Sequence, residues 1–192
     1  MPSNKIILGF VGDLASGKGT ICKYLKEKYN VTSYRFSTML RDILNRIYVE
    51  QSRPNLQDLS TFLRQRYGQD IMSTVIAKDV QNDPNSIVAV EGIRRPTDIT
   101  YLKDLPGFVL IALAVSERTR FERLLLRAEN PDDQKKTWEQ FQAEGRQESE
   151  QKIAELMREA SYTIDNNGSM DELFKQVDEI VASVITRSEA TL

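Results

Sequence analysis

A glycine-rich loop at residues 12–20 constrains the fold of this chain more than any other feature. The loop reads Gly-Asp-Leu-Ala-Ser-Gly-Lys-Gly-Thr, and the apolar run before it, at residues 6–11, is typical of a buried strand. After the loop, Ile21 and Leu25 recur at helical spacing. A strand, the pattern G-x-x-x-x-G-K-x-T and a helix in this order are typical of a P-loop. The sequence therefore predicts a strand–loop–helix unit that binds phosphates.

The residues of this loop have different expected parts in phosphate binding. Its backbone N–H groups and the N-terminal end of the following helix would surround the phosphates. Lys18 would reach the β- and γ-phosphates, and the Thr20 hydroxyl would bind Mg²⁺. Gly19 separates these two residues, whereas many P-loops place Ser or Thr directly after the lysine. The alternative is a glycine-rich strand-to-helix turn that binds no ligand, but such a turn would not require the complete P-loop pattern. The expected binding residues of the loop are Gly12, Ala15, Ser16, Gly17, Lys18, Gly19 and Thr20.

Composition limits the classes of protein to which the chain can belong. Its 192 residues suffice for one domain with a sizeable core, and a hydrophobic content of 40% is ordinary for a globular protein. The net charge of −2 gives no electrostatic reason to bind a nucleic acid polymer. Apolar runs are too short to span a membrane, no signal peptide is expected, and Cys22 has no partner for an intrachain disulfide. We therefore expect a cytoplasmic protein that binds neither a membrane nor nucleic acid.

The chain contains no histidine. Catalysis by Ser-His or Cys-His nucleophile pairs is therefore excluded, since the imidazole base is missing.

Apolar runs alternate with amphipathic segments along the whole chain. Strands are expected at residues 6–11, 31–36, 87–90, 109–115 and 162–164. Helices are expected at residues 21–30, 37–47, 56–67, 70–80, 98–105, 117–127, 137–158 and from 169 onward. This alternation predicts an α/β fold in which helices cover both faces of a mostly parallel sheet. Ligands of such sheets lie at the carboxyl ends of the strands.

Charged residues follow the expected strand at 87–90. Glu91 stands where a Walker B acid would stand, and it would hold Mg²⁺ through water. A carboxylate that caps the turn at Gly92 is the alternative. Arg94 and Arg95 come next, and a guanidinium fork matches the geometry of a phosphate. The sequence favours Arg94 over Arg95 but leaves open which of them points toward the ligand.

Further arginines lie on two expected helices. Arg120, Arg123 and Arg127 share one face of the helix at 117–127, directly before a polar segment at 129–136 that would be a mobile loop. Such arginines usually stay solvated, but these could cover a nucleotide when a lid closes and excludes water. Arg146 is a further lid candidate.

Ser37 is the expected N-cap of the helix at 37–47. Arg41 lies one turn into that helix, from which it would reach an acceptor phosphate; the alternative is an exposed arginine paired with a carboxylate. Near the C-terminus, residues 165–168 form an expected turn, and Ser169 with Glu172 forms a capping box.

Several of these motifs together resemble a known family. Residues 12–20, 36–41 and 91–94, with Arg123-x-x-x-Arg127, resemble the adenylate kinase-like nucleoside monophosphate kinases. Residues 160–169 are more similar to dephospho-CoA kinases, and the whole chain is similar to adenylate-kinase-related proteins with an Asp-Gly-Ile-Arg version of the fourth motif. The resemblance implies a three-layer single domain with a five-stranded parallel sheet. It also implies a helical acceptor-binding insertion at about 37–83 and a short lid at about 128–148.

The resemblance also implies roles for individual residues, with ATP and Mg²⁺ as cofactors. Arg123 would lie beside the adenine, Arg127 would meet the transferred phosphoryl group, and the backbone of Asn167 and Gly168 would touch the adenine. Lys18, Arg94, Arg123 and Arg127 would be the catalytic residues, and Thr20 and Glu91 would hold the metal. The acceptor would be bound by residues from three segments, which are Ser37, Arg41, Glu91, Gly92, Arg94 and Arg95.

The expected acceptor follows partly from chemistry. A nucleoside monophosphate is already ionised at neutral pH and needs no base, whereas the ribose hydroxyl of dephospho-CoA should be deprotonated by a carboxylate. Dephospho-CoA kinases keep an acid just after the second strand, where this chain has Ser37 and Thr38, with Asp42 set back in the helix. This favours a nucleoside or deoxynucleoside monophosphate kinase that is a monomer or homodimer. A dephospho-CoA kinase and a regulatory nucleotide-binding ATPase are the alternatives.

Overall fold

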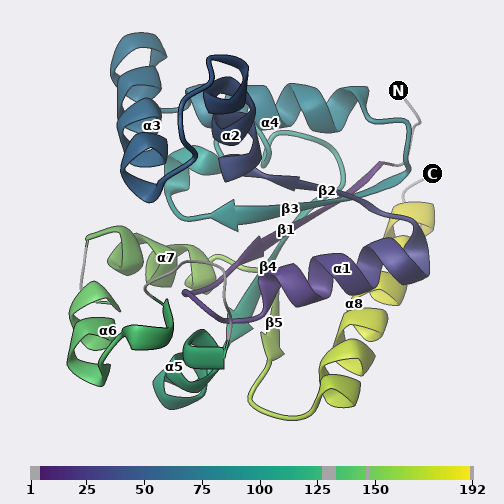
Figure 1. The fold of residues 1–192 in the computed structure, drawn as a ribbon. Coiled ribbons are helices and arrows are strands. Elements are labelled where there is room, and N and C mark those ends of the chain that lie inside the picture. The colour runs from purple at the N-terminus through teal and green to yellow at the C-terminus, as the bar shows by residue number, and fades with distance from the viewer. Residues whose placement is uncertain (1–4, 127–132, 146–147, 191–192) are drawn as a thin grey trace.

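A single parallel sheet forms the centre of the fold. The computed structural model describes residues 5–126, 133–145 and 148–190. Within them, five parallel strands lie in the order β2-β3-β1-β4-β5 (Figure 1). The strands are β1 (Ile6–Val11), β2 (Thr32–Arg35), β3 (Ile87–Ile93), β4 (Phe108–Ala114) and β5 (Tyr162–Asp165). β1 is the central strand, and every one of its residues is buried, as its uninterrupted apolar run predicts.

Helices cover both faces of this sheet. The described helices are α1 (Lys18–Tyr29), α2 (Phe36–Arg46), α3 (Arg53–Tyr67), α4 (Ile71–Asn82), α5 (Glu117–Leu126), α6 (Trp138–Gly145), α7 (Glu148–Arg158) and α8 (Met170–Ala190). On one face, α1 and α8 lie side by side and bury side chains such as Ile21 and Val177 against the sheet (Figure 1). On the other face, α2, α4 and α7 contribute buried residues such as Leu40, Ile76 and Leu156. The predicted α/β class and the five-stranded parallel sheet are confirmed.

Several predicted element boundaries differ from the structure. The strand predicted at 87–90 continues to Ile93, because Arg35 of β2 still pairs with Glu91 and Val11 of β1 with Ile93. The helix predicted to start at Ser37 starts at Phe36, whose side chain is buried in the core. Ser37 is therefore not an N-cap but lies inside the first turn, and no side chain of the described residues caps α2.

The prediction of a helix at 98–105 is wrong. A short 3₁₀ helix at Pro96–Asp98 is followed only by turns up to β4. Ile99 and Leu102 are buried at helical spacing, but they pack from a turn, and the side chain of Asp98 is occupied with the preceding backbone. The long helix predicted at 137–158 is divided into α6 and α7, with residues 146–147 outside the described part.

Two local predictions have clear outcomes. The capping box of α8 is confirmed, since the Ser169 amide donates to Glu172 Oε2 at 2.7 Å and the Glu172 amide donates to Ser169 Oγ at 3.3 Å. None of the helices in the described part of the chain combines the length and the apolar character needed to cross a bilayer.

Candidate nucleotide-binding site

The predicted P-loop leaves the carboxyl end of β1, between the neighbouring strands β3 and β4. Its curl requires left-handed backbone at Ala15 and Gly17, with φ of 61° and 99°. A Cβ at Gly17 would collide with the side-chain amide of Asn166, so glycine is needed there for space as well as for conformation. Gly17 occupies the N-cap position of α1, and no side chain of the described residues caps this helix. The amides of the first turn of α1 are therefore available to an anion.

Lys18 folds back over this loop. Its Nζ donates to the carbonyl oxygens of Gly12 at 2.6 Å and Asp13 at 2.8 Å, and to Ser16 Oγ at 3.1 Å. The positive charge thus lies inside the curl of the loop, next to the uncapped helix terminus. Both features favour negative charge at the same place.

Asn166, which directly follows the edge strand β5, holds the loop by a hydrogen bond. It follows β5, its backbone amide donates to the Ala114 carbonyl at 3.0 Å, and its buried side chain donates from Nδ2 to the Ser16 carbonyl at 2.8 Å. Sequence analysis named Asn167 and Gly168 but missed Asn166. Those two residues are exposed, and Asn167 Oδ1 accepts the Ser116 amide at 2.8 Å. A polar residue directly after the last strand was the available signal.

Glu91 faces the start of α1. Its carboxylate is buried, and a Cβ at Gly19 would lie 3.9 Å from its Oε2. Its Oε1 lies 3.3 Å from Nε of Arg35, the residue opposite it in the pairing of β2 and β3. The charge of Glu91 also contributes, after burial, to raising the pKa of the Cys22 thiol in α1 to about 12. Sequence analysis missed Arg35, although it ends a strand at the predicted rim.

A buried carboxylate holds the backbone of Arg94 and Arg95. Asp98 Oδ2 accepts both amides at 3.0 Å, and Asp98 Oδ1 accepts from Nη2 of Arg64 in α3 at 2.7 Å. Arg64 also donates from Nη1 to the Gln69 carbonyl. The side chain of Arg94 is exposed, whereas Arg95 is half-buried. Sequence analysis missed the Arg64–Asp98 ion pair.

Arg41 is not among the residues that the described contacts bring to the P-loop. It is half-buried in α2, and its Nη1 donates to Gln51 Oε1 at 3.4 Å, in the segment before α3. Ser37 is half-buried one turn earlier. The turn predicted at Gly92 is not found, because Gly92 lies within β3, although its φ of 82° departs from regular strand backbone.

One arginine of α5, Arg120, contacts the P-loop. Nη2 of Arg120 lies 3.5 Å from Oδ2 of Asp13 in the loop, and its guanidinium lies over the ring of Phe141 in α6, 5.4 Å from the centroid. Arg123 is half-buried, and its Nη1 is buried without a hydrogen-bond partner in the described part of the chain. Arg127 and Arg146 lie outside the described residues, so their predicted lid roles stay predictions.

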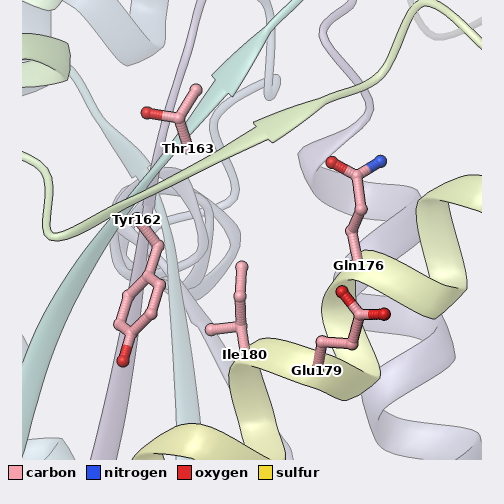
Figure 2. A pocket seen from close by; sticks show the side chains of 5 residues that line it. All are labelled: Tyr162, Thr163, Gln176, Glu179 and Ile180. Carbon is pink, nitrogen blue, oxygen red and sulfur yellow. The ribbon is translucent and has the colours of Figure 1, made fainter.

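A pocket of about 320 Å³ lies elsewhere, between β5 and α8 (Figure 2). It is lined by Tyr162, Thr163, Gln176, Glu179 and Ile180. Gln176 already uses its side-chain amide to donate to the Asp165 carbonyl at 2.8 Å and to accept the Asp165 amide at 2.9 Å. The pocket contains none of the predicted site residues, and the side-chain amide of Gln176 is already bonded to the backbone of β5.

Comparisons with known proteins agree with this fold. The model of the family described as AAA domain matches residues 11–142, which include the P-loop. Relatives include the UPF0200 protein of Hyperthermus butylicus, 25% identical over 94% of this chain and 95% of that protein. The UPF0200 protein of Thermococcus onnurineus is 28% identical over 94% of this chain and 97% of that protein.

Solved structures show the same architecture. The shikimate kinase from Bacteroides thetaiotaomicron superposes with a TM-score of 0.62 at 14% identity, over 91% of this chain and 96% of that one. The shikimate kinase from Acinetobacter baumannii in complex with shikimate superposes with a TM-score of 0.56 at 15% identity, over 94% of this chain and 96% of that one. At these identities the likeness shows the fold, which is that of P-loop kinases.

Proposed function

This chain belongs to the AAA domain family, and from that premise we propose that it catalyses ATP- and Mg²⁺-dependent phosphoryl transfer to a nucleoside or deoxynucleoside monophosphate. One observation carries the proposal: the uncapped start of α1 and the Nζ of Lys18 lie together at the carboxyl end of the central strand β1. A half-buried cation and a helix start without a side-chain cap at one place fit a polyphosphate. The proposal treats the chain as one kinase domain with an acceptor-binding insertion at about 37–83 and a lid at about 128–148.

The residues of the site fit ATP and its metal. The amides of the loop and Lys18 would hold the phosphates, and Asn166 keeps the loop curled by its bond to Ser16. Thr20 and Glu91 would hold Mg²⁺, because Thr20 lies in the first turn of α1, Glu91 of β3 faces that turn, and both supply the oxygen ligands that this ion prefers. When bound, the metal would neutralise charge on the phosphates during transfer.

The remaining predicted residues belong to the acceptor and to the lid. Arg94, on the turn held by Asp98, and Arg41, in α2, would bind the phosphate of the acceptor. Arg123 would lie beside the adenine, since its buried Nη1 has no protein partner in the described residues. Arg127, outside the described part, would reach the transferred phosphoryl group. A monophosphate acceptor is ionised, so this scheme needs no general base.

A second candidate is a dephospho-CoA kinase, and one observation favours it. A hydroxyl acceptor needs a base, and Glu91 is a buried carboxylate that faces the start of α1. Against it, Arg35 already pairs with Glu91, and no acid follows β2 before Asp42. A regulatory ATPase is the third possibility, in which no acceptor would change the rate of hydrolysis.

A panel assay tests the proposal. ADP release from ATP and Mg²⁺ is measured with the full chain and each nucleoside monophosphate, each deoxynucleoside monophosphate, dephospho-CoA and shikimate. A strong response to a monophosphate supports the proposal. A response to dephospho-CoA or shikimate alone would identify a hydroxyl acceptor instead, and equal rates with every acceptor would identify an ATPase.

A matched pair of variants tests the site. Lys18→Ala should abolish transfer, whereas Lys23→Ala should not, because Lys23 is exposed on α1 and lies 3.9 Å from its partner Glu27. Equal activity of the two variants would refute the assignment of the P-loop.

A further inference from the structure

Building on the proposed function, we propose that Arg120 is a positioning residue that neutralises Asp13 in the P-loop, so that the loop can accept a polyphosphate, and that it joins the loop to α6. Neither residue belongs to the set of phosphate ligands derived above. The pair would explain how the loop tolerates an acid at its second position.

Asp13 brings a negative charge into a loop built for anions. Its backbone carbonyl accepts from Lys18 Nζ at 2.8 Å, so the residue lies within the curl that this lysine closes. Its carboxylate lies 3.5 Å from Nη2 of Arg120. An uncompensated carboxylate at this place would repel the phosphates, and Coulomb forces are stronger near a protein surface than in bulk water.

Arg120 is held where it can supply the opposite charge. Its side chain is 11% exposed and that of Asp13 is 27% exposed, so water screens the pair only partly. The Nε of Arg120 is buried and has no hydrogen-bond partner within the described residues. Among the residues that the structure describes, the carboxylate of Asp13 and the ring of Phe141 are the two groups that contact this guanidinium. These contacts favour charge compensation of Asp13 as the role of this guanidinium.

The same side chain connects the loop to α6. Phe121, Leu124 and Phe141 form a small buried cluster, against which Leu14 and Ala15 of the loop and Trp138 of α6 pack. Arg120 lies over the ring of Phe141 at 5.4 Å, on the edge of this cluster. A change in the charge around Asp13 should therefore also reach α6, where Trp138 is the only tryptophan of the chain.

Titration calorimetry of the full chain with ATP and Mg²⁺ tests the inference. Arg120→Met should raise the Kd about tenfold or more, because it leaves the Asp13 charge uncompensated beside the phosphates. Asp13→Asn/Arg120→Met removes both charges and should return the Kd to within about threefold of wild type. Asp13→Asn alone should bind ATP at least as tightly as wild type.

Arg118→Met is the matched control. Arg118 lies on the same helix, pairs with Glu122 at 2.8 Å and lies over the ring of Trp138 at 5.9 Å, but its side chain is 70% exposed. It removes the same charge and the same kind of ring contact away from the loop. Its Kd should stay within about twofold of wild type, since exposed ion pairs contribute little.

Each remaining outcome overturns a defined claim. If the wild-type chain binds no ATP, the proposed function fails and this inference fails with it. If wild type binds and Arg120→Met binds equally well, only the inference fails. If Arg120→Met is weak and Asp13→Asn does not rescue it, Arg120 acts on the nucleotide or on folding and not by neutralising Asp13. Asp13 is only half-buried, so Asp13→Asn should fold, and a Kd above wild type for that single variant would also overturn the inference.

Discussion

The buried ion pair between Arg64 and Asp98 offers a sharp test of how the Arg94 turn is supported. Asp98→Ala would remove a carboxylate that accepts Arg64 Nη2 at 2.7 Å and two backbone amides at 3.0 Å. The two side chains are 8% and 4% exposed, so the guanidinium would stay buried without its counter-charge. Its Nε has no partner in the described residues, and only its bond to the Gln69 carbonyl would remain.

The size of the loss follows from this burial. Removing one partner of a buried ion pair costs about 3–5 kcal/mol, because the remaining charge loses its compensation. The two amides add less, since Arg94 is exposed and water can replace the carboxylate there. We expect a loss of about 4 kcal/mol, a large part of the roughly 5–15 kcal/mol that stabilise a typical domain.

Urea unfolding measures this loss directly. Asp104→Ala is the control, because Asp104 is exposed on the neighbouring turn and its change should stay within about 0.5 kcal/mol. The double variant Arg64→Met/Asp98→Asn removes both charges but keeps an acceptor for the two amides, so it should be roughly 1–3 kcal/mol more stable than Asp98→Ala. In active variants of Asp98, the KM for the acceptor should rise while the KM for ATP stays constant. A loss below about 1 kcal/mol for Asp98→Ala would refute this account of the turn.

Three further predictions concern other contacts of the site. Asn166→Ala should weaken ATP binding by about tenfold, measured by calorimetry, because the loop loses the bond to the Ser16 carbonyl; an unchanged Kd would contradict this. Arg41→Ala should raise the KM for the acceptor and leave ATP binding intact, and unchanged acceptor kinetics would show that the acceptor binds elsewhere. Burial raises the pKa of the Cys22 thiol from 9.0 to about 12, so the folded state keeps its proton and stability should fall as pH rises above 9; Cys22→Ala should reduce this fall but not abolish it, because the pKa values of Lys28 and Tyr34 are raised as well.

The elements that sequence analysis predicted well are those specified by local patterns. Continuous apolar runs identified β1, β3 and β4, because the inner strands of a parallel sheet are buried on both faces, whereas the edge strands β2 and β5 are shorter and only partly buried. The P-loop was found because its glycines and lysine stand at fixed spacing. The capping box of Ser169 and Glu172 was found because both partners lie within one turn.

The failures share one physical cause, which is competition from distant residues. The helix predicted at 98–105 has the right apolar spacing, but Asp98 bonds to the backbone of the preceding turn and to Arg64, 34 positions away in the chain. Asn166 holds Ser16 across 150 positions, and no local pattern reports such a contact. Ser37 was misplaced as an N-cap because burial of Phe36 starts α2 one residue earlier.

The arrangement of the missed residues explains how the site is built. Arg35 ends β2 and pairs with Glu91 of β3, which faces the start of α1, and Asn166 directly follows β5 and bonds to the loop, so three strands supply side chains that support the loop and the helix after β1. All of them stand at carboxyl ends, because parallel strands bring those ends to one rim. The loop and the start of α1 are thus held by the rigid sheet. Arg41 and Arg64, in contrast, lie on helices of the segment proposed to bind the acceptor. Changes of acceptor should therefore require changes in α2 and α3, while the contacts that hold the nucleotide loop can stay the same.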